Sequence, residues 1–283
     1  MVVLEETIRM RKDIQVSKIL VHPIKMVLIT PRIETDDRSP HGGVLKISFP
    51  ENSGCESFAV PLYPVEERWE RLSNIALWGH EVDGFVCENQ NSSGRSPSTI
   101  LSEYFGCSVH LTVKGNKPRP CDPTDSFPGL KATTLYQDGY PLLVLSEESI
   151  DVLHEEIRSR VGMQGIADQW SKQEFVIERF RPNIVLRGAG PFAEDDFEEI
   201  SIGSDDDSEI TGEKQPGILL LPNVCPDTGV RDKAVPYKVL MKFRIGLDPQ
   251  NKMKPCVGCN GVPLGSGIIQ VGDSVNVRRI IAA

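Results

Sequence analysis

The sequence predicts an α+β protein that consists mainly of β-strands. Short runs of β-branched and aromatic residues that end at glycine or proline recur along the whole chain, whereas few stretches carry the spacing and caps of a helix. Frequent Gly/Pro turns between short strands are typical of a barrel or a strongly bent sheet. The length of 283 residues allows one large domain or two ordinary ones, with a core that needs no disulfides.

In the first 115 residues the strand patterns are short, and several stop at a proline. Pro23 and Pro50 mark such ends, since proline cannot donate a hydrogen bond to a central ladder. Strands are expected at Val16–Ile24, Gly43–Phe49, Ser57–Leu62, Ile75–Gly79, Gly84–Cys87 and Ser108–Val113.

Three segments have helical patterning. One is Val65–Leu72, and another follows Ser96, which can cap a helix whose first turn starts with a proline. The clearest follows the apolar strand Leu142–Leu145: Ser146 is the expected cap, acidic residues open the helix, apolar residues recur at helical spacing and Gly162 ends it.

A stretch dense in proline, glycine and aspartate over residues 115–129 suits neither a helix nor a central strand, so we expect a domain boundary or hinge there. Beyond it the pattern again favours β-structure. Strands are expected at Phe175–Glu178, Asn183–Arg187, Phe197–Ile202, Ile218–Leu221, Tyr237–Phe243 and Gly267–Ile281.

Composition excludes several classes of protein. With 31 Lys+Arg against 40 Asp+Glu the net charge is −9, so no partnership with nucleic acid or anionic lipid is expected. Only 39% of residues are apolar, which argues against a membrane bundle or a transmembrane segment. Charged residues from Glu5 to Asp13 stand where a signal peptide would be apolar, and seven cysteines suit a reducing compartment. We therefore expect an intracellular, cytoplasmic protein.

Other candidate sites are weak. Cys256 and Cys259 form a CxxC that could be half a zinc site or a redox pair, but no second ligand pair accompanies it, which favours free thiols. The five histidines lack metal-like spacing. The acidic run Asp205–Glu209 lacks EF-hand spacing and is expected to be a solvated loop.

Five blocks together resemble a known family. They are HPIK at 22–25, YQDGYPLLVLSEESI at 136–150, RFRPNIVLRGAGPFAEDDFEEISIG at 179–203, LPNVCPDTGV at 221–230 and GIIQVGDSV at 267–275. Their order and spacing are similar to the MOSC family, named for the C-terminal domain of molybdenum cofactor sulfurase, and most similar to its eukaryotic amidoxime-reducing branch. The resemblance implies a MOSC-type β-barrel at residues 126–283, preceded by a smaller, incomplete N-terminal β-barrel-like domain at 14–125.

The same resemblance implies a molybdenum cofactor (molybdopterin), reduction of N-hydroxylated small molecules and a haem-protein electron donor. Family cofactor contacts map onto Lys25, Arg181, Asn183 and Asn223. The chemistry suits an anionic pterin, because arginine grips a phosphate bidentately, lysine adds charge and asparagine can address ring donors and acceptors. The alternative is that Arg181 pairs with Glu178 or Asp195 at the surface while Asn183 sits in a turn.

One departure from the family concerns the metal. The family places a cysteine ligand to molybdenum at the position of Leu219, and leucine has no donor atom. Cys225, the nearest thiol in sequence, would lie roughly 20 Å further along an extended strand at about 3.3 Å per residue. A structural role is therefore the favoured interpretation of Cys225, and no metal ligand is assigned.

A second departure is the loss of sequence blocks. The family continues for several dozen residues after the position of Lys25, and a polar stretch at 203–217 replaces a strand. The hypothesis is an alternatively spliced, wrongly assembled or degenerate member, and its enzymatic activity stays open. The alternatives are a non-catalytic pterin carrier, or sulfur transfer through a persulfide on Cys225, Cys256 or Cys259. Pyridoxal phosphate, which belongs to a separate domain of the sulfurase, is not expected.

Overall fold

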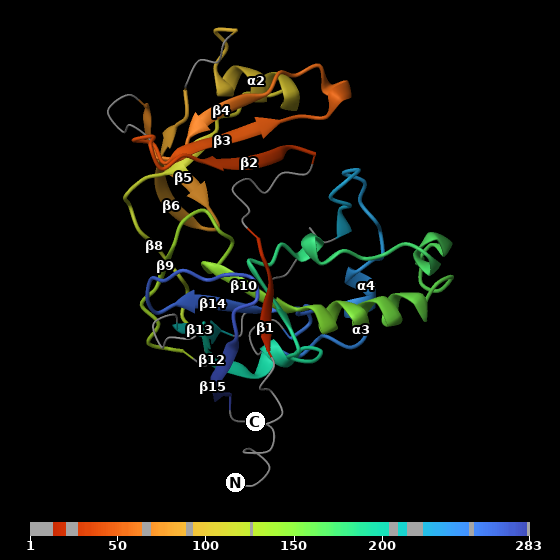
Figure 1. The fold of residues 1–283 in the computed structure, drawn as a ribbon. Coiled ribbons are helices and arrows are strands. Elements are labelled where there is room, and N and C mark those ends of the chain that lie inside the picture. The colour runs from red at the N-terminus through yellow and green to blue at the C-terminus, as the bar shows by residue number, and fades with distance from the viewer. Residues whose placement is uncertain are drawn as a thin grey trace. The chain divides into compact units, whose positions relative to one another are not determined.

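The chain forms two compact units (Figure 1). The computed structural model describes residues 14–20, 28–63, 69–88, 93–124, 127–203, 209–213, 223–248 and 252–281. Residues 1–21 and 120–283 make up the first unit, here called the larger unit, and residues 22–119 make up the second, here called the inserted unit. The predicted boundary region at 115–129 contains the junction between the two at 119/120.

The larger unit is built on a seven-stranded sheet. Its order is β1 (Gln15–Ile19), β11 (Ile184–Arg187), β10 (Leu142–Ser146), β14 (Cys259–Pro263), β13 (Glu209–Glu213), β12 (Phe197–Ile202) and β15 (Val275–Ile280). The sheet curves so far that its two edges meet at one isolated antiparallel bridge, Gln15 with Ser274. The expected mainly β, α+β class is therefore confirmed, with the edges joined at a bridge and not along a full ladder.

The first strand lies in a different unit from the one expected. The sequence placed residues 14–21 in the N-terminal domain, but β1 pairs antiparallel with β11, and Val16 opposes Leu186. The physical reason is burial, since Ile14 and Val16 lose all or nearly all exposure in a core shared with Ile184. The kinship of residues 22–119 to a MOSC N-terminal domain stays a prediction.

Helix α3 (Glu147–Arg158) covers part of the sheet much as its sequence predicts. Ile150, Leu153 and Ile157 recur at helical spacing and are buried in one cluster with Trp170. Ser146 precedes the helix in extended conformation, but its hydroxyl meets the Ser149 hydroxyl at 2.5 Å instead of capping a backbone N–H. The acidic first turn and the terminal Arg158 suit the helix dipole.

Two expected strands of the larger unit are wrong. Phe175–Glu178 runs into the 3-10 turn η4 (Ile177–Phe180), and Tyr237–Phe243 starts with the short helix α4 (Tyr237–Leu240). Short apolar runs do not distinguish strand from buried helix, and in the second case packing of Val239 and Leu240 into the core decides the outcome. Two further 3-10 turns are η3 (Asp168–Ser171) and η5 (Ala193–Asp196). The strand expected at Ile218–Leu221 lies outside the described residues.

The inserted unit contains two three-stranded antiparallel sheets. They are β2 (Thr30–Thr35), β3 (Gly43–Ser48) and β4 (Phe58–Pro61), and β5 (Arg71–Leu77), β6 (His80–Val86) and β7 (Thr112–Lys114). Helix α2 (Pro97–Phe105) is capped by Ser96 as predicted, with the hydroxyl accepting from the Thr99 N–H. A 3-10 turn, η1 (Glu51–Ser53), completes the described elements of the inserted unit. A separate two-stranded sheet consists of β8 (Arg119–Pro120), at the junction, and β9 (Thr133–Thr134) of the larger unit.

The helix expected at Val65–Leu72 does not extend to its predicted end. Residues 64–68 lie outside the described part, and Arg71 and Leu72 already belong to β5. These residues pair with β6, where Arg71 opposes Phe85, so their backbone forms strand hydrogen bonds and not helical ones.

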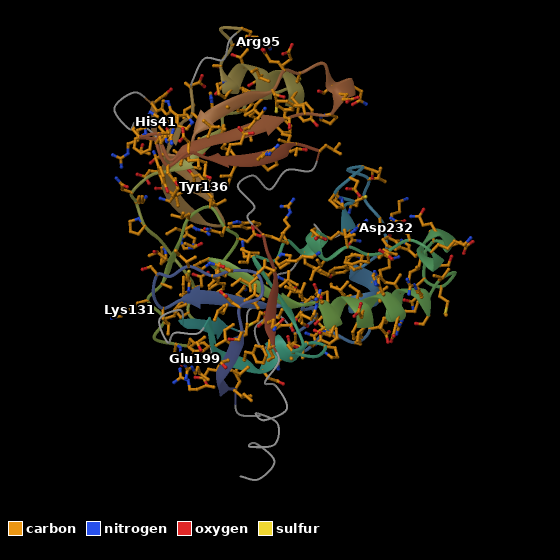
Figure 2. The ribbon with its side chains drawn as sticks, in the orientation of Figure 1. His41, Arg95, Lys131, Tyr136, Glu199 and Asp232 are labelled. Carbon is orange, nitrogen blue, oxygen red and sulfur yellow. The ribbon has the colours of Figure 1, made fainter. Side chains whose placement is uncertain are left out.

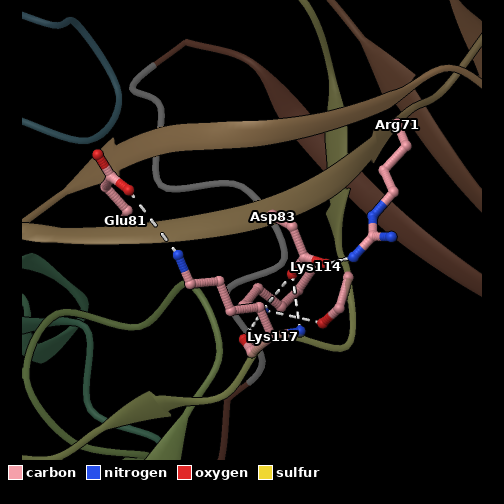
Figure 3. A network of polar contacts seen from close by, with 6 residues as sticks. Arg71, Glu81, Asp83, Lys114 and Lys117 are labelled. Carbon is pink, nitrogen blue, oxygen red and sulfur yellow. Dashed lines mark hydrogen bonds and ion pairs between the residues drawn. The ribbon is translucent and has the colours of Figure 1, made fainter.

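A buried carboxylate ties the second sheet of the inserted unit to the chain that follows it (Figure 3). Asp83 on β6 is 1% exposed, and its oxygens accept from Lys114 Nζ at 3.0 Å, Arg71 at 2.7 Å and the Lys117 N–H at 2.9 Å. Gly115 passes so close that a Cβ there would lie 2.5 Å from the Asp83 Cγ. The network therefore fixes the exit of β7 at a point where only glycine fits.

Across the described segments, no helix is both long enough and apolar enough to cross a membrane.

Candidate functional site

The segment Arg179–Asn183 is the turn that leads from η4 into β11, and it presents two arginines differently. η4 ends at Arg181, whose backbone takes the left-handed conformation with φ 57° and ψ 48°. For a residue other than glycine this costs about 1 kcal/mol or more, and such strain concentrates at functional positions. Arg179 is buried and Arg181 is half-buried.

Arg181 has no hydrogen bond or ion pair from its side chain to any described residue. Partial burial lowers the pKa of its guanidinium, and the charge of Asp138 opposes that effect. Its alternative partners are occupied: Glu178 pairs with Lys18 at 2.9 Å, and Asp195 pairs with Arg244 at 2.6 Å. The surface ion pair that the sequence left open is thus not formed. A half-buried guanidinium that forms no ion pair with a described residue can bind an anion.

Asn183 joins three stretches of the sheet. Its Oδ1 accepts from the Leu143 N–H at 3.0 Å and its Nδ2 donates to the Leu20 carbonyl at 3.3 Å, while its backbone also bonds both residues. An amide has two N–H donors, so one N–H remains for a ligand. Asn183 therefore acts first as a structural link between β1 and β10.

Asn223 begins a small hairpin. Its backbone carbonyl accepts from the Asp232 N–H at 2.7 Å, its Nδ2 donates to the Asp232 carbonyl at 2.9 Å, and Val224 bridges Arg231. Asn223 is 2% exposed, and its Oδ1 has no hydrogen-bond partner within the described residues. A buried oxygen without a hydrogen-bond partner is uncommon in proteins, and a ligand with an N–H or O–H group would satisfy it.

Arg179 brings the arginine turn and this hairpin together. Its guanidinium lies 5.4 Å from the Trp170 ring centre and 5.2 Å from that of Phe175. Burial lowers the pKa of Arg179, and the charges of Cys225, Asp232 and Asp227 on the hairpin oppose this. The Trp170 Nε1–H donates to Asp232 Oδ2 at 2.8 Å, and Figure 2 labels Asp232 on the segment before α4.

Cys225 lies in the turn of the hairpin and is half-buried. Its N–H donates to the Val230 carbonyl at 2.9 Å, and its carbonyl accepts from Gly229 at 2.9 Å. Burial by itself would raise the pKa of the Cys225 thiol. Hydrogen bonds from the Thr228 hydroxyl and backbone and from the Asp227 N–H, together with the charge of Arg179, outweigh burial and lower the pKa.

Two positions named by the sequence cannot be placed, because Lys25 and Leu219 lie outside the described residues. Sequence analysis also missed Arg179, Trp170 and Asp232. Arg179 and Arg181 lie two residues apart in one short motif, and the sequence does not show which of them is buried. In the structure Arg179 is buried, and the backbone takes the left-handed conformation at Arg181.

Both cysteines of the CxxC pair are buried, and neither is in a disulfide. Cys256 and Cys259 are each 4% exposed, and burial raises the pKa of the Cys256 thiol to about 11. A thiol with a raised pKa is a poor nucleophile at neutral pH. Over the ranges that the structure describes, no three His, Cys, Asp or Glu side chains are grouped so as to hold a metal ion.

A cavity in the larger unit lies elsewhere, with a volume of about 770 Å³. It is lined by residues 127–133, Pro141, residues 262–264 and Arg279; Lys131 is labelled in Figure 2. Within this cavity, Arg279 is already paired with Glu199 at 2.6 Å.

Comparisons with known proteins agree with the sequence blocks. The MOSC domain profile matches residues 131–276, just over half of the chain. "Mitochondrial amidoxime-reducing component 1" of Mus musculus is 34% identical over 211 residues, covering 72% of this chain and 55% of that protein. "Mitochondrial amidoxime reducing component 2" of Homo sapiens is 27% identical over 211 residues, covering 72% and 56%. "Molybdenum cofactor sulfurase" of Danio rerio is 28% identical over 165 residues, covering 54% and 18%. The chain spans about half the length of the amidoxime-reducing relatives.

Proposed function

The chain belongs to the MOSC domain family, and on that basis we propose that it binds the molybdenum cofactor. The observation that carries the proposal is Arg181, a half-buried guanidinium without a hydrogen-bonded or ion-paired partner among the described residues. An anionic phosphate of the pterin is the chemistry that would satisfy it. The names of the relatives, amidoxime-reducing components and a molybdenum cofactor sulfurase, support the same class of cofactor.

Four residues are proposed to hold the group, and the structure describes three of them. Arg181 would bind the phosphate, the open Oδ1 of Asn223 would accept from a ring N–H, and the remaining N–H of Asn183 would donate to a ring acceptor. Lys25 is proposed to add a positive charge from the HPIK block. When bound, the cofactor would supply a metal centre able to exchange two electrons. The residues of this chain bind and orient it.

The reaction is proposed by kinship. We infer reduction of N-hydroxylated small molecules, because the similar proteins are named amidoxime-reducing components. The haem-protein electron donor is proposed from the family resemblance of the sequence blocks alone. These names also include "mitochondrial", so the cytoplasmic location inferred from composition stays a prediction for this chain. Pyridoxal phosphate is not part of the proposal.

Leu219 favours a second candidate, a carrier that binds the pterin without catalysis. Molybdenum in such a site calls for a soft thiolate, and leucine cannot provide one. A chain that keeps Arg181 and Asn223 but lacks the thiolate would retain the pterin and lose the metal. The two candidates therefore differ in metal content and not in pterin content.

We expect Arg181→Gln to lower pterin content about tenfold, since a hydrogen bond to a charged group contributes about 1.5–3 kcal/mol. The proteins are purified from a host that makes the cofactor, and pterin is measured by fluorescence after oxidation and molybdenum by mass spectrometry. Arg158→Gln, at the exposed end of α3, is the matched control and should keep the wild-type pterin content.

Each result separates the candidates. Stoichiometric molybdenum with pterin supports the oxidoreductase and means that another group replaces the missing ligand. Pterin without molybdenum supports the carrier. Wild-type protein that contains neither contradicts the cofactor proposal.

A further inference from the structure

Strand β2 lies at one end of the three-stranded sheet that it forms with β3 and β4 (Figure 1). Among the described strands it pairs with β3 alone, in a register that is unbroken over six residues. Residues 30–35 are all exposed or half-buried. An edge of this kind can accept a further strand. The backbone groups and side chains of β2 determine which strand would fit.

The backbone groups of the odd-numbered residues of β2 point away from β3. Directly after the strand, the Asp36 N–H donates to the Gly42 carbonyl at 3.1 Å, on the side of β3. Because the direction alternates along an antiparallel strand, even-numbered residues face β3, and Pro31, Ile33 and Thr35 face the open side. Pro31 suits this arrangement, since the N–H that it lacks would lie on the side without a described partner strand.

Ile33 leaves an apolar side chain exposed at this edge. It lies opposite Leu45 of β3, and two residues further along β3 Ile47 is fully buried in the core of the inserted unit. Side chains two residues apart share a face, so Ile33 belongs to the apolar face of the sheet. Its place at the edge nevertheless leaves it 40% exposed. A second isoleucine beside it would continue the apolar face.

The other face of β2 is self-complementary in charge. Arg32 and Glu34 flank Ile33 in the sequence, and their side chains are 77% and 45% exposed. If two β2 strands pair antiparallel about Ile33, each Arg32 lies opposite the Glu34 of the other copy. These are non-hydrogen-bonded pairs, in which side chains come closest, and opposite charges there stabilise the pairing.

We propose that two copies of this chain associate through their β2 strands, antiparallel and centred on Ile33. The two Ile33 residues exchange a pair of backbone hydrogen bonds, and each Thr35 N–H donates to the Pro31 carbonyl of the other copy. Centring the pair on Thr35 would instead bring Glu34 opposite Asp36, two like charges. Centring it on Pro31 would oppose two residues that lack an N–H.

This association does not rest on the proposed cofactor, because it concerns the inserted unit. One pair of strands buries a small area, so the dimer is expected to be weak and to depend on concentration. Sedimentation equilibrium of the purified full chain, at concentrations up to about 0.5 mM, measures it. We expect the average mass to rise with concentration towards that of two chains.

Two charge reversals test the register. Arg32→Glu and Glu34→Arg each place like charges opposite one another, so each should weaken the association about tenfold or more. The double variant exchanges the two charges and should associate like the wild type. Glu51→Arg makes the same change of charge as Glu34→Arg at an exposed position of η1, and as the control it should leave the association unchanged.

An equimolar mixture of the two single variants provides a further test. Each variant alone carries like charges on this face, but the two together are again complementary, so the mixture should associate more strongly than either variant. A wild-type chain that keeps the mass of one copy at every concentration would overturn the proposal. Wild-type association in both single variants would also overturn it, because another surface would then carry the contact. A mixture that associates no better than its components would contradict the register.

Discussion

Replacing Asp83 with asparagine is expected to lower the free energy of unfolding of the inserted unit by about 3–5 kcal/mol. The substitution keeps the shape but removes the charge that faces Lys114, whose side chain is 5% exposed. A buried ammonium left without its carboxylate loses its compensation, which is why breaking one partner of a buried pair costs so much. Urea denaturation followed by fluorescence measures the change.

Glu34→Gln is the control for that experiment. Glu34 Oε1 lies 3.8 Å from Arg32 Nε, and the two side chains are 45% and 77% exposed. Loss of this ion pair should therefore lower the free energy of unfolding by less than about 1 kcal/mol. Equal effects of the two substitutions would show that the Asp83 network contributes no more than a surface contact.

The same carboxylate has a defined pH dependence. Burial alone would raise the pKa of Asp83, but the hydrogen bonds from Arg71, Lys114 and the Lys117 N–H overcome it and hold the pKa well below its usual value. A group with a lowered pKa contributes stability above its unfolded pKa, about 4, and loses it as the pH falls further. The wild-type protein should therefore lose an acid-sensitive part of its stability that Asp83→Asn lacks.

Glu194→Gln is expected to act in the opposite direction and to stabilise the larger unit by about 3 kcal/mol at pH 8. Glu194 is fully buried in η5, and its Oε1 accepts from the Ser149 hydroxyl at 3.1 Å. Burial, with a smaller contribution from the charge of Asp195, raises its pKa from 4.5 to about 7. The folded chain thus keeps a proton that the unfolded chain has already released.

The sign follows from that difference. Below pH 4.5 both states hold the proton, and the wild type and the glutamine variant should be similarly stable. As the pH rises from 4.5 to about 7 the wild type loses stability, and above that range the deficit is complete. Urea denaturation at pH 5, 6, 7 and 8 measures it, with Glu155→Gln, exposed on α3, as the control. Parallel curves for the wild type and Glu194→Gln would contradict the prediction.

Local signals predicted some elements well and others poorly, for a physical reason. Helix α3 was predictable because its acidic first turn and apolar spacing lie within one short segment, although it ends at Arg158 with Ser159 as its C-cap and not at the predicted Gly162. The segment at Tyr237–Phe243 offered only apolar residues, and its outcome depended on packing against α3, which lies far away in the sequence. Placement of β1 depended in the same way on β11.

The candidate site shows the same division. The resemblance of the Arg179–Gly203 block pointed to Arg181 and Asn183 as candidate cofactor contacts. It did not show that the Oδ1 of Asn183 already accepts a hydrogen bond from the Leu143 N–H. Nor could it reveal the environment of Cys225, for which a structural role was the favoured interpretation. The groups that lower its pKa come from the turn itself and from Arg179, and only folding brings them together.

The position of β1 also imposes an order on folding during synthesis. The Ser17 hydroxyl donates to the Val185 carbonyl across 168 residues of sequence, and the Gln15 backbone also meets Ser274. At about 5–20 residues per second a ribosome needs roughly 10–30 s to make the partner strand after β1. Residues 22–119 are complete well before then and can fold first. The apolar side chains of β1 therefore stay exposed until β11 has been made. During that interval the nascent chain is vulnerable to aggregation.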